Sequence, residues 1–348
     1  MKLVILIGTL IANILASANE TGNCYTGRYL YSSERVLNYK GKLINTIDPS
    51  INVSRHDYIV QYGIDNLKSF KNGSVNLDLT KPRKIGAPGI GVKVTTTRYT
   101  LYGRFTARFS SINVPGVVTA FITMSDVGDE IDYEIVGPKP IPVTTNVFYH
   151  TVGKTVPEYE RGVHGKKHYL KKDVGEIHTY TIDWKHDSIT WMIDGEVIRI
   201  VNKADSISKL NPNGPKWFPT TPSLIQFAVW DAGRVGLSDY TWQGGPTEWG
   251  TKTRLTSFWE YVDIECYDDD DQIVQKWPAN KSNPNPTVIY PIPPNRFPAK
   301  TGVYNSPSSV VNSNLPFDKT PSEVVSNAFQ SNWSLIIYVL LSVVTISL

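Results

Sequence analysis

Alternation of apolar and polar residues predicts several short β-strands in this chain. The clearest example covers residues 99–110, where Phe105, Ala107 and Phe109 would share one face. Arg104, Thr106 and Arg108 would share the other. Residues 117–124 are more continuously apolar. No long stretch of period 3.6 is present, so the pattern predicts strands rather than long helices.

A hairpin is expected where Asp194 and Gly195 separate two further alternating segments, residues 188–193 and 196–201. Many short strands with turn signals between them favour an all-β fold, an antiparallel β-sandwich of the jelly-roll type. A single domain of this class can reach about 250 residues. The remaining expected strands are residues 177–184, 224–230 and 261–267.

The composition permits a packed core and gives no sign of a nucleic-acid partner. Hydrophobic residues make up 41% of the 348 residues and charged residues 19%, which excludes wholesale disorder. The 35 Lys and Arg exceed the 32 Asp and Glu by only three, so a basic binding face has no support. Two cysteines cannot form a four-thiolate zinc site. We expect a monomer that requires neither a metal nor a cofactor.

The N-terminal residues have the parts of a secretory signal peptide. Met1-Lys2 provides a basic start, residues 3–15 form a mostly apolar run, and Ala16-Ser17-Ala18 is a small-residue cleavage site. We therefore predict that residues 1–18 are removed on secretion. The alternative is an uncleaved anchor, for which the apolar run is short.

The C-terminal residues predict a lipid-anchored tail. Residues 334–348 read SLIIYVLLSVVTISL, and no charged residue follows them. A terminal apolar tail without a basic stop is typical of a GPI-attachment signal. Ser326 or Asn327 is the expected attachment residue, and residues 327–348 are the expected propeptide. A short transmembrane tail anchor is the alternative.

A secreted protein meets an oxidising environment and the glycosylation machinery. Cys24 and Cys266 are therefore expected to form a disulfide that joins the two ends of the folded domain. Two separate buried thiols are the alternative. Sequons place expected glycans on Asn52, Asn72 and Asn280.

A change of composition after residue 271 predicts where the folded domain ends. Residues 272–326 are rich in Pro, Ser and Asn without a clear strand pattern, which is typical of an extended stalk. Residues 19–271 are the predicted folded domain. The acidic run at residues 268–271 lacks the ligand spacing of a Ca²⁺ loop, so we interpret it as solvated, with a Ca²⁺ site as the alternative.

The candidate chemistry lies in one predicted strand. Glu130, Asp132 and Glu134 alternate with apolar residues such as Ile131 and Tyr133. In a strand, three carboxylates would therefore share one face while the apolar side chains occupy the other. The apolar face would pack into the core, and the acidic face would line a site.

Crowded carboxylates repel one another, but they raise the pKa of a group that must keep its proton. Cleavage of a glycosidic bond needs one carboxylate that attacks and one carboxylic acid that protonates the leaving oxygen. In an extended strand the Cα atoms of Glu130 and Glu134 lie about 13 Å apart. Their side chains must lean together, or the strand must bend, to reach the roughly 5–5.5 Å of a retaining pair. The alternative is an acidic strand that is merely exposed to solvent.

The motif Glu130-Ile131-Asp132-Tyr133-Glu134 resembles the E-x-D-x-E active-site signature of glycoside hydrolase family 16. Its surroundings, over residues 60–267, resemble the fungal Crh-type cell-wall transglycosylases of that family. The resemblance implies a concanavalin-like jelly roll with a concave glycan cleft, and a double displacement that retains configuration. It implies that Glu130 is the nucleophile, Asp132 an assisting carboxylate and Glu134 the general acid/base.

The same resemblance suggests substrate-binding residues. Thr145-Asn146-Val147-Phe148 resembles the Asn-x-Phe of the following strand, which directs Asn146 and Phe148 toward the glycan. Residues 230–249 resemble an aromatic, Gly-rich loop of Crh-type members. The aromatic residues expected to contact sugar rings are Trp230, Trp242, Trp249 and Tyr149. Trp184 and Trp191 are instead expected in the core.

These observations predict a retaining glycosidase or transglycosylase that acts on chitin or β-glucan in the cell wall, held at the cell surface and membrane by its tail. An endo-β-glucan hydrolase without transfer is one alternative, because water and sugar hydroxyls compete for the same glycosyl-enzyme. A non-catalytic, lectin-like surface protein is the alternative of another class. A lectin would have no reason to keep both Glu130 and Glu134.

Overall fold

The strands form an antiparallel β-sandwich, as the alternation of apolar residues predicts. The computed structural model describes residues 24–38, 55–149, 164–209, 211–233 and 242–277. These residues contain sheets of eight, nine and two strands. Two short 3-10 helices, η1 (Ile64–Asn66) and η2 (Lys203–Asp205), occur among them. Within the described residues, every helix is too short or too polar to cross a membrane.

The eight-stranded sheet contains the predicted acidic strand, β10. Its neighbouring strands are antiparallel except for the parallel pair β3 and β4. In spatial order the strands are β12 (Lys166–His168), β11 (Val143–Phe148), β10 (Glu130–Ile135), β9 (Val117–Ser125), β16 (Ser223–Asp231), β7 (Val92–Thr96), β4 (Tyr58–Tyr62) and β3 (Val36–Asn38).

The nine-stranded sheet covers the apolar face of the first sheet. Seven of its strands follow one path, and two short strands pair with β17 beside that path. In order they are β15 (Glu196–Asn202), β14 (Ser188–Ile193), β13 (Ile177–Trp184), β8 (Gly103–Ser110), β17 (Arg254–Tyr267), β6 (Ser74–Thr80) and β5 (Leu67–Lys71), with β2 (Gly27–Tyr29) and β18 (Ile273–Val274) beside β17. The third sheet pairs β1 (Cys24–Tyr25) with β19 (Lys276–Trp277).

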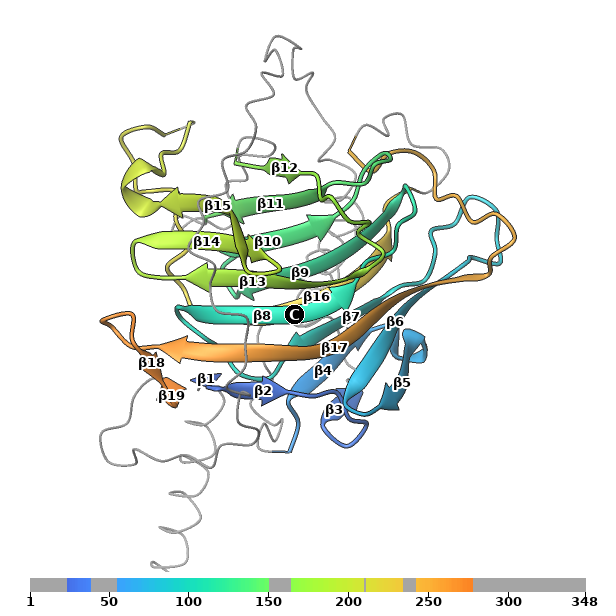
Figure 1. Ribbon diagram of the computed structural model, residues 1–348, viewed down its shortest axis with the longest axis horizontal. Helices are drawn as coiled ribbons and strands as arrows, with labels where there is room; N and C mark the ends of the chain where they lie inside the picture. The colour runs from blue at the N-terminus through green and yellow to red at the C-terminus, as the bar shows by residue number, and fades with distance from the viewer. Residues whose placement is uncertain (1–23, 39–54, 150–163, 210, 234–241, 278–348) are drawn as a thin grey trace, which may run out of the picture.

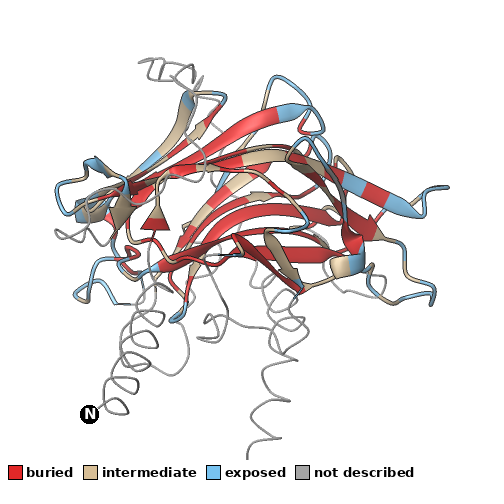
Figure 2. Cartoon of the chain, turned by 90° about the horizontal axis from the view of Figure 1, so that it is seen from below, coloured by how far each residue is buried: buried red, intermediate tan, exposed pale blue. Residues whose placement is uncertain are grey.

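The main core lies between the two large sheets, which form two layers of strands (Figure 1). Buried residues run along most strands of both layers (Figure 2). Stacked aromatic rings fill this space: the Phe109 ring centroid lies 3.8 Å from that of Trp259 and 4.3 Å from that of Tyr180. Trp184 and Trp191 are fully buried in the same core, as predicted.

The expected strands are present, with differences at their ends. Strand β8 begins at Gly103 rather than at residue 99, because Tyr102 has a φ of 61° and ends the extended conformation before it. Strand β17 begins at Arg254 rather than at residue 261. Its first half contains Ser257, a polar residue that is nevertheless fully buried and donates a hydrogen bond to Ser110 O at 2.6 Å. That buried serine hides the alternation in the sequence.

The predicted hairpin between β14 and β15 is confirmed. Asp194 and Gly195 both have positive φ, 52° and 82°, which is the conformation that a two-residue Asp-Gly turn requires.

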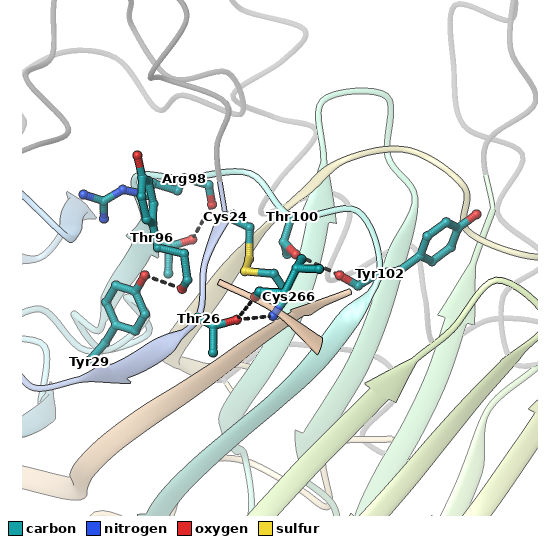
Figure 3. The surroundings of a disulfide bond; sticks show 10 residues. Cys24, Thr26, Tyr29, Thr96, Arg98, Thr100, Tyr102 and Cys266 are labelled. Atoms are coloured by element: carbon teal, nitrogen blue, oxygen red, sulfur yellow. Dashed lines mark hydrogen bonds between the residues drawn. A yellow bond between two sulfur atoms is a disulfide. The ribbon is translucent and has the colours of Figure 1, made fainter. Parts of the chain in front are cut away.

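The disulfide between Cys24 and Cys266 joins the beginning and the end of the described residues, as predicted (Figure 3). Both cysteines are buried, and 242 residues separate them in sequence. Thr26 reinforces the junction, because its hydroxyl accepts the Cys266 N–H at 2.9 Å and donates to Val274 O at 2.5 Å. Strands β18 and β19 follow residue 271 and extend the pairing to Trp277.

Replacing both cysteines by alanine should lower the free energy of unfolding by about 2–5 kcal/mol, because the closed loop is long and both side chains are buried. Urea unfolding measures the loss. Reducing agent should destabilise the wild-type protein similarly and leave the double variant unchanged. Equal unfolding midpoints for the two proteins would contradict the prediction.

Candidate active site

Strand β10 presents apolar side chains to the core and carboxylates to the opposite face of the eight-stranded sheet. Ile131 and Tyr133 are fully buried in the main core. On the other face, Glu130 and Glu134 are half-buried, while Asp132 between them is only 1% exposed. The alternation predicted for this strand is therefore confirmed. We call the face that carries the three carboxylates the acidic face.

Hydrogen bonds from the core side fix the backbone of β10. The Tyr133 hydroxyl is directed at Met192 O and Thr181 O of the second sheet, at 2.8 and 3.1 Å. The Trp191 indole donates from Nε1 to Asp132 O at 3.0 Å. The second sheet therefore fixes the strand from behind, and the carboxylates are left to the other side.

Both ends of β10 are fixed as well. Before the strand, fully buried Asp129 accepts three hydrogen bonds at Oδ2, from the N–H groups of Thr220 and Thr221 at 2.9 and 3.1 Å and from the Thr221 hydroxyl at 2.7 Å. Near the other end, Thr144 Oγ1 donates to Glu134 O at 2.7 Å. These contacts limit the movement of the strand along its length.

Cross-strand pairing brings two predicted residues beside the carboxylates. On β11, Asn146 is directly opposite Asp132, and Phe148 is directly opposite Glu130. Residues directly opposite each other in an antiparallel pair lie on the same face. Asn146 and Phe148 therefore belong to the acidic face, where the sequence also expects them.

A small apolar cluster lies on the acidic face, separate from the main core. Val118, Ala120 and Ile122 of β9 form most of it, together with Val136. The partly buried residues packed against it are Met124, Trp230, Ala232 and Trp242. Trp230 is paired with Val118 across the strands, which fixes its side chain on this face. Two of the predicted aromatic residues are thus next to the carboxylate strand.

The loop that carries Trp242 is held close to the start of β9 and the end of β10. Gly116 N donates to Gln243 O at 2.7 Å. Gly244 has a φ of 84°, and a Cβ at this position would lie 2.2 Å from Pro138 N. Only glycine permits this approach, which brings the Trp242 loop against the segment that follows β10.

Of the three carboxyl groups, that of Asp132 is the one whose protonated, neutral form is favoured most strongly. Burial raises its pKa well above the ordinary value, and the charges of Glu130 and Glu134 raise it further. Its Oδ1 has no hydrogen-bond partner among the described residues, while its carboxyl group hydrogen-bonds Glu130. Asp132 therefore keeps a proton and donates it in a hydrogen bond to Glu130.

Glu130 and Glu134 differ in their electrostatic surroundings. Burial raises the pKa of both. For Glu130, the hydrogen bond from Asp132 and the positive charge of Lys93 oppose that rise and favour the ionised form. For Glu134, the charge of Glu130 adds to burial and the pKa rises to about 8. The surroundings thus favour the ionised form more at Glu130 than at Glu134, the difference that a nucleophile and a proton donor require.

Two polar residues of the acidic face were not predicted from the sequence. Lys93 on β7 is 5% exposed, and burial lowers its pKa to about 8, against the opposing effect of the Glu130 charge. Gln226 on β16 is 1% exposed. Each stands between core residues in an apolar segment, and this interruption of the apolar pattern is the signal that could have identified both.

Other predicted residues lie elsewhere or outside the described residues. Tyr149 and Trp249 pack against the main core, and the Tyr149 ring centroid lies 6.0 Å from that of Trp217, so their contact with a substrate stays a prediction. Asn72 is exposed, with a φ of 53°, between β5 and β6. The residues that fall outside the described part of the chain are Asn52, Asn280, Ser326, Asn327 and the signal peptide at residues 1–18.

The acidic run at residues 268–271 makes local hydrogen bonds. Asp268 Oδ1 accepts the N–H groups of Asp270 and Gln272 at 3.0 and 2.8 Å. Asp271 Oδ1 lies 2.8 Å from His186 Nδ1. In the described part of the chain, His, Cys, Asp and Glu do not gather in groups of three or more that could hold a metal ion.

Comparison with known proteins identifies relatives of this chain. The family model described as glycosyl hydrolases family 16 matches residues 54–252. Crh-like protein 2 of Aspergillus fumigatus is 35% identical over 204 residues, which is 56% of this chain and 43% of that protein. Probable glycosidase CRR1 of Saccharomyces cerevisiae is 30% identical over 245 residues, 68% of this chain and 54% of that protein. The chain thus spans about half the length of these curated relatives.

A solved structure described as "Crh5 transglycosylase in complex with NAG" is also similar. The two chains are 24% identical, with a TM-score of 0.49, and the match covers 71% of this chain and 89% of that one.

Removing the charge of Glu130 should lower the pKa of Glu134. Glu130→Gln keeps the side-chain shape but removes the negative charge that acts together with burial. We expect the pKa to fall below about 8 yet remain above the ordinary value of 4.5, because burial remains. Titration of the ¹³C carboxyl signal of Glu134 measures it. Glu260→Gln, on β17 of the other sheet, is the control and should leave the Glu134 pKa unchanged. An unchanged Glu134 pKa in Glu130→Gln would contradict the coupling between the two carboxyl groups.

Proposed function

This chain belongs to glycosyl hydrolase family 16, and on that premise we propose that it is a retaining enzyme that cleaves and religates β-linked polysaccharide. The observation that supports this most directly is the set of three carboxyl groups on one face of β10, with surroundings that favour different protonation states. Two carboxyl groups that differ in protonation are what a double displacement at an anomeric carbon needs.

In the first step, ionised Glu130 attacks the anomeric carbon of the sugar. The bond from that carbon to the bridging oxygen breaks, and Glu134 gives its proton to this oxygen, so the leaving sugar departs neutral. Asp132 keeps its proton and hydrogen-bonds Glu130, which orients the nucleophile. As negative charge leaves Glu130 on ester formation, Asp132 still carries the proton that its buried position favours.

In the second step, Glu134 acts as the base, because it is now ionised. It removes a proton from an incoming hydroxyl group, whose oxygen attacks the anomeric carbon and releases Glu130. A sugar hydroxyl gives transfer to another chain, and water gives hydrolysis. Both steps invert the carbon, so the original configuration is retained.

The substrate we propose is chitin or β-glucan. Trp230 and Trp242 lie partly exposed on the acidic face and offer rings on which sugar C–H faces can stack. Asn146 adds an amide directly opposite Asp132. An uncharged polysaccharide is compatible with a net charge of only +3. The similarity to Crh-like proteins favours transfer over plain hydrolysis.

We further propose that the enzyme acts in the cell wall while held at the plasma membrane. The support comes from the sequence: the predicted signal peptide, the proline-rich stalk and the apolar C-terminal tail. A stalk of this kind would let the catalytic domain reach wall polymers at a distance from the bilayer.

Incubation of the purified protein with chitin and β-glucan oligosaccharides and a fluorescent acceptor oligosaccharide tests the activity. We expect labelled products longer than the acceptor. Glu130→Gln and Glu134→Gln should each lower kcat by about 10³-fold or more, because one removes the nucleophile and the other the acid. Circular dichroism and Tm show whether the variants remain folded.

The outcomes separate the three functions. Only shortened products would indicate a hydrolase without transfer. Binding without any product would indicate a lectin-like protein. Full activity in either glutamine variant would refute the assigned roles.

The pH dependence offers an independent measurement. Glu134 must be protonated to donate to the leaving oxygen, and its pKa is about 8, so kcat/KM should fall as the pH rises through about 8. The decline should move to lower pH in any active variant that lowers the Glu134 pKa. A profile that stays flat to pH 10 would contradict the role of Glu134 as the acid.

A further inference from the structure

Gln226 is a buried amide whose polar atoms have no hydrogen-bond partner among the described residues. It lies on β16 and is 1% exposed, and neither Nε2 nor Oε1 makes a hydrogen bond in the part of the chain that the structure describes. Burying an amide without hydrogen bonds destabilises a fold, so native proteins rarely keep one without a reason. The position of this amide suggests the reason.

The side chain of Gln226 lies on the acidic face. Its neighbours along the strand, Ile225 and Phe227, belong to the main core, so the alternation of the strand turns Gln226 the other way. Cross-strand pairing aligns Gln226 with Ile122 and aligns Ile122 with Asp132. Gln226 and Asp132 are therefore in one row, two strand spacings or about 10 Å apart.

The adjacent row across the sheet contains small side chains at its centre. Glu134 is paired with Ala120, Ala120 with Ala228, and Ala228 with Lys93. The two positions between the carboxyl group and the lysine are thus both alanine. Trp230 follows two residues later on the strand and faces the same way. Small side chains bordered by polar groups and an indole ring suit a flat, polar ring such as a sugar.

We propose that Gln226 is a substrate-binding residue, whose amide hydrogen-bonds two hydroxyl groups on adjacent carbons of a sugar next to the one that is cleaved. This inference rests on the function proposed above and adds a residue to the same site. The amide Nε2 donates and Oε1 accepts, while each sugar hydroxyl can do both, so the two groups are complementary. The amide carries no charge, as suits an uncharged polysaccharide.

A structural role and a binding role predict opposite effects on stability. If Gln226 held the fold together, replacing its amide would lower Tm. Because the amide has no partner in the described residues, an apolar side chain of the same length should instead relieve an unfavourable burial and raise Tm. Loss of substrate affinity together with a gain in stability is a combination that a structural residue would not give.

Gln226→Met is the decisive variant, because methionine matches glutamine in length but lacks its hydrogen-bonding groups. With chitin and β-glucan oligosaccharides as substrates, we expect KM for the cleaved polymer to rise about tenfold and kcat to change less. Tm, without substrate, should rise by about 2–4 °C. Gln226→Asn keeps the amide on a shorter side chain that no longer reaches the sugar, so it should also raise KM. This variant tests the proposal if the methionine variant does not fold.

Thr123→Val is the matched control. Thr123 Oγ1 is likewise buried and has no partner within the described ranges, but Thr123 is paired with Ile131 and Ile225 and faces the main core. The valine variant should raise Tm in the same way and leave KM unchanged. This control separates the relief of a buried polar group from the loss of a substrate contact.

An active Gln226→Met protein with unchanged KM would overturn this assignment and leave the proposed function intact. A fall in Tm together with loss of activity in both Gln226 variants would show that the amide is structural, which also overturns it. Wild-type protein that neither binds nor converts any oligosaccharide would instead overturn the proposed function itself.

Discussion

The hydrogen bond from the Tyr133 hydroxyl across the core to Met192 O, at 2.8 Å, shows how the sandwich supports its acidic strand. Three carboxyl groups on one strand repel one another, and the strand needs compensation from its other face. Buried Ile131 and Tyr133 and the Trp191 indole on Asp132 O supply it. The core therefore stabilises an arrangement that the acidic face by itself would destabilise.

Burial raises the pKa of all three carboxyl groups, and their different neighbours separate them. Each experiences desolvation, but only Asp132 lies between two other acids, and only Glu130 receives both a hydrogen bond from Asp132 and the charge of Lys93. For Glu134, burial and the negative charge of Glu130 together raise the pKa to about 8. The surroundings thus differ from one position of the strand to the next, as the different roles proposed for the three carboxyl groups require.

Other buried polar groups on the acidic face also lower the stability of the fold, and the rest of the domain offsets this loss. Buried Lys93 costs folding free energy, and so does the Gln226 amide, which has no partner in the part of the chain that the structure describes. The aromatic core and the disulfide between residues 242 positions apart act against that cost. A stable scaffold that offsets unfavourable buried polar groups is typical of proteins whose sites are organised for a ligand.

The sequence by itself determined most strands from β8 to β17, the disulfide and the alternation of β10, because period-two patterning and cysteine count are local or compositional properties. It could not show that β16 lies between β9 and β7, since that order depends on pairing between segments about a hundred or more residues apart. Only that pairing aligns Gln226 with Asp132 and places Lys93 on the face that carries Glu130. Tertiary structure likewise decided that Trp230 and Trp242 join the acidic face while Trp249 packs against the core, because one aromatic side chain suits either environment.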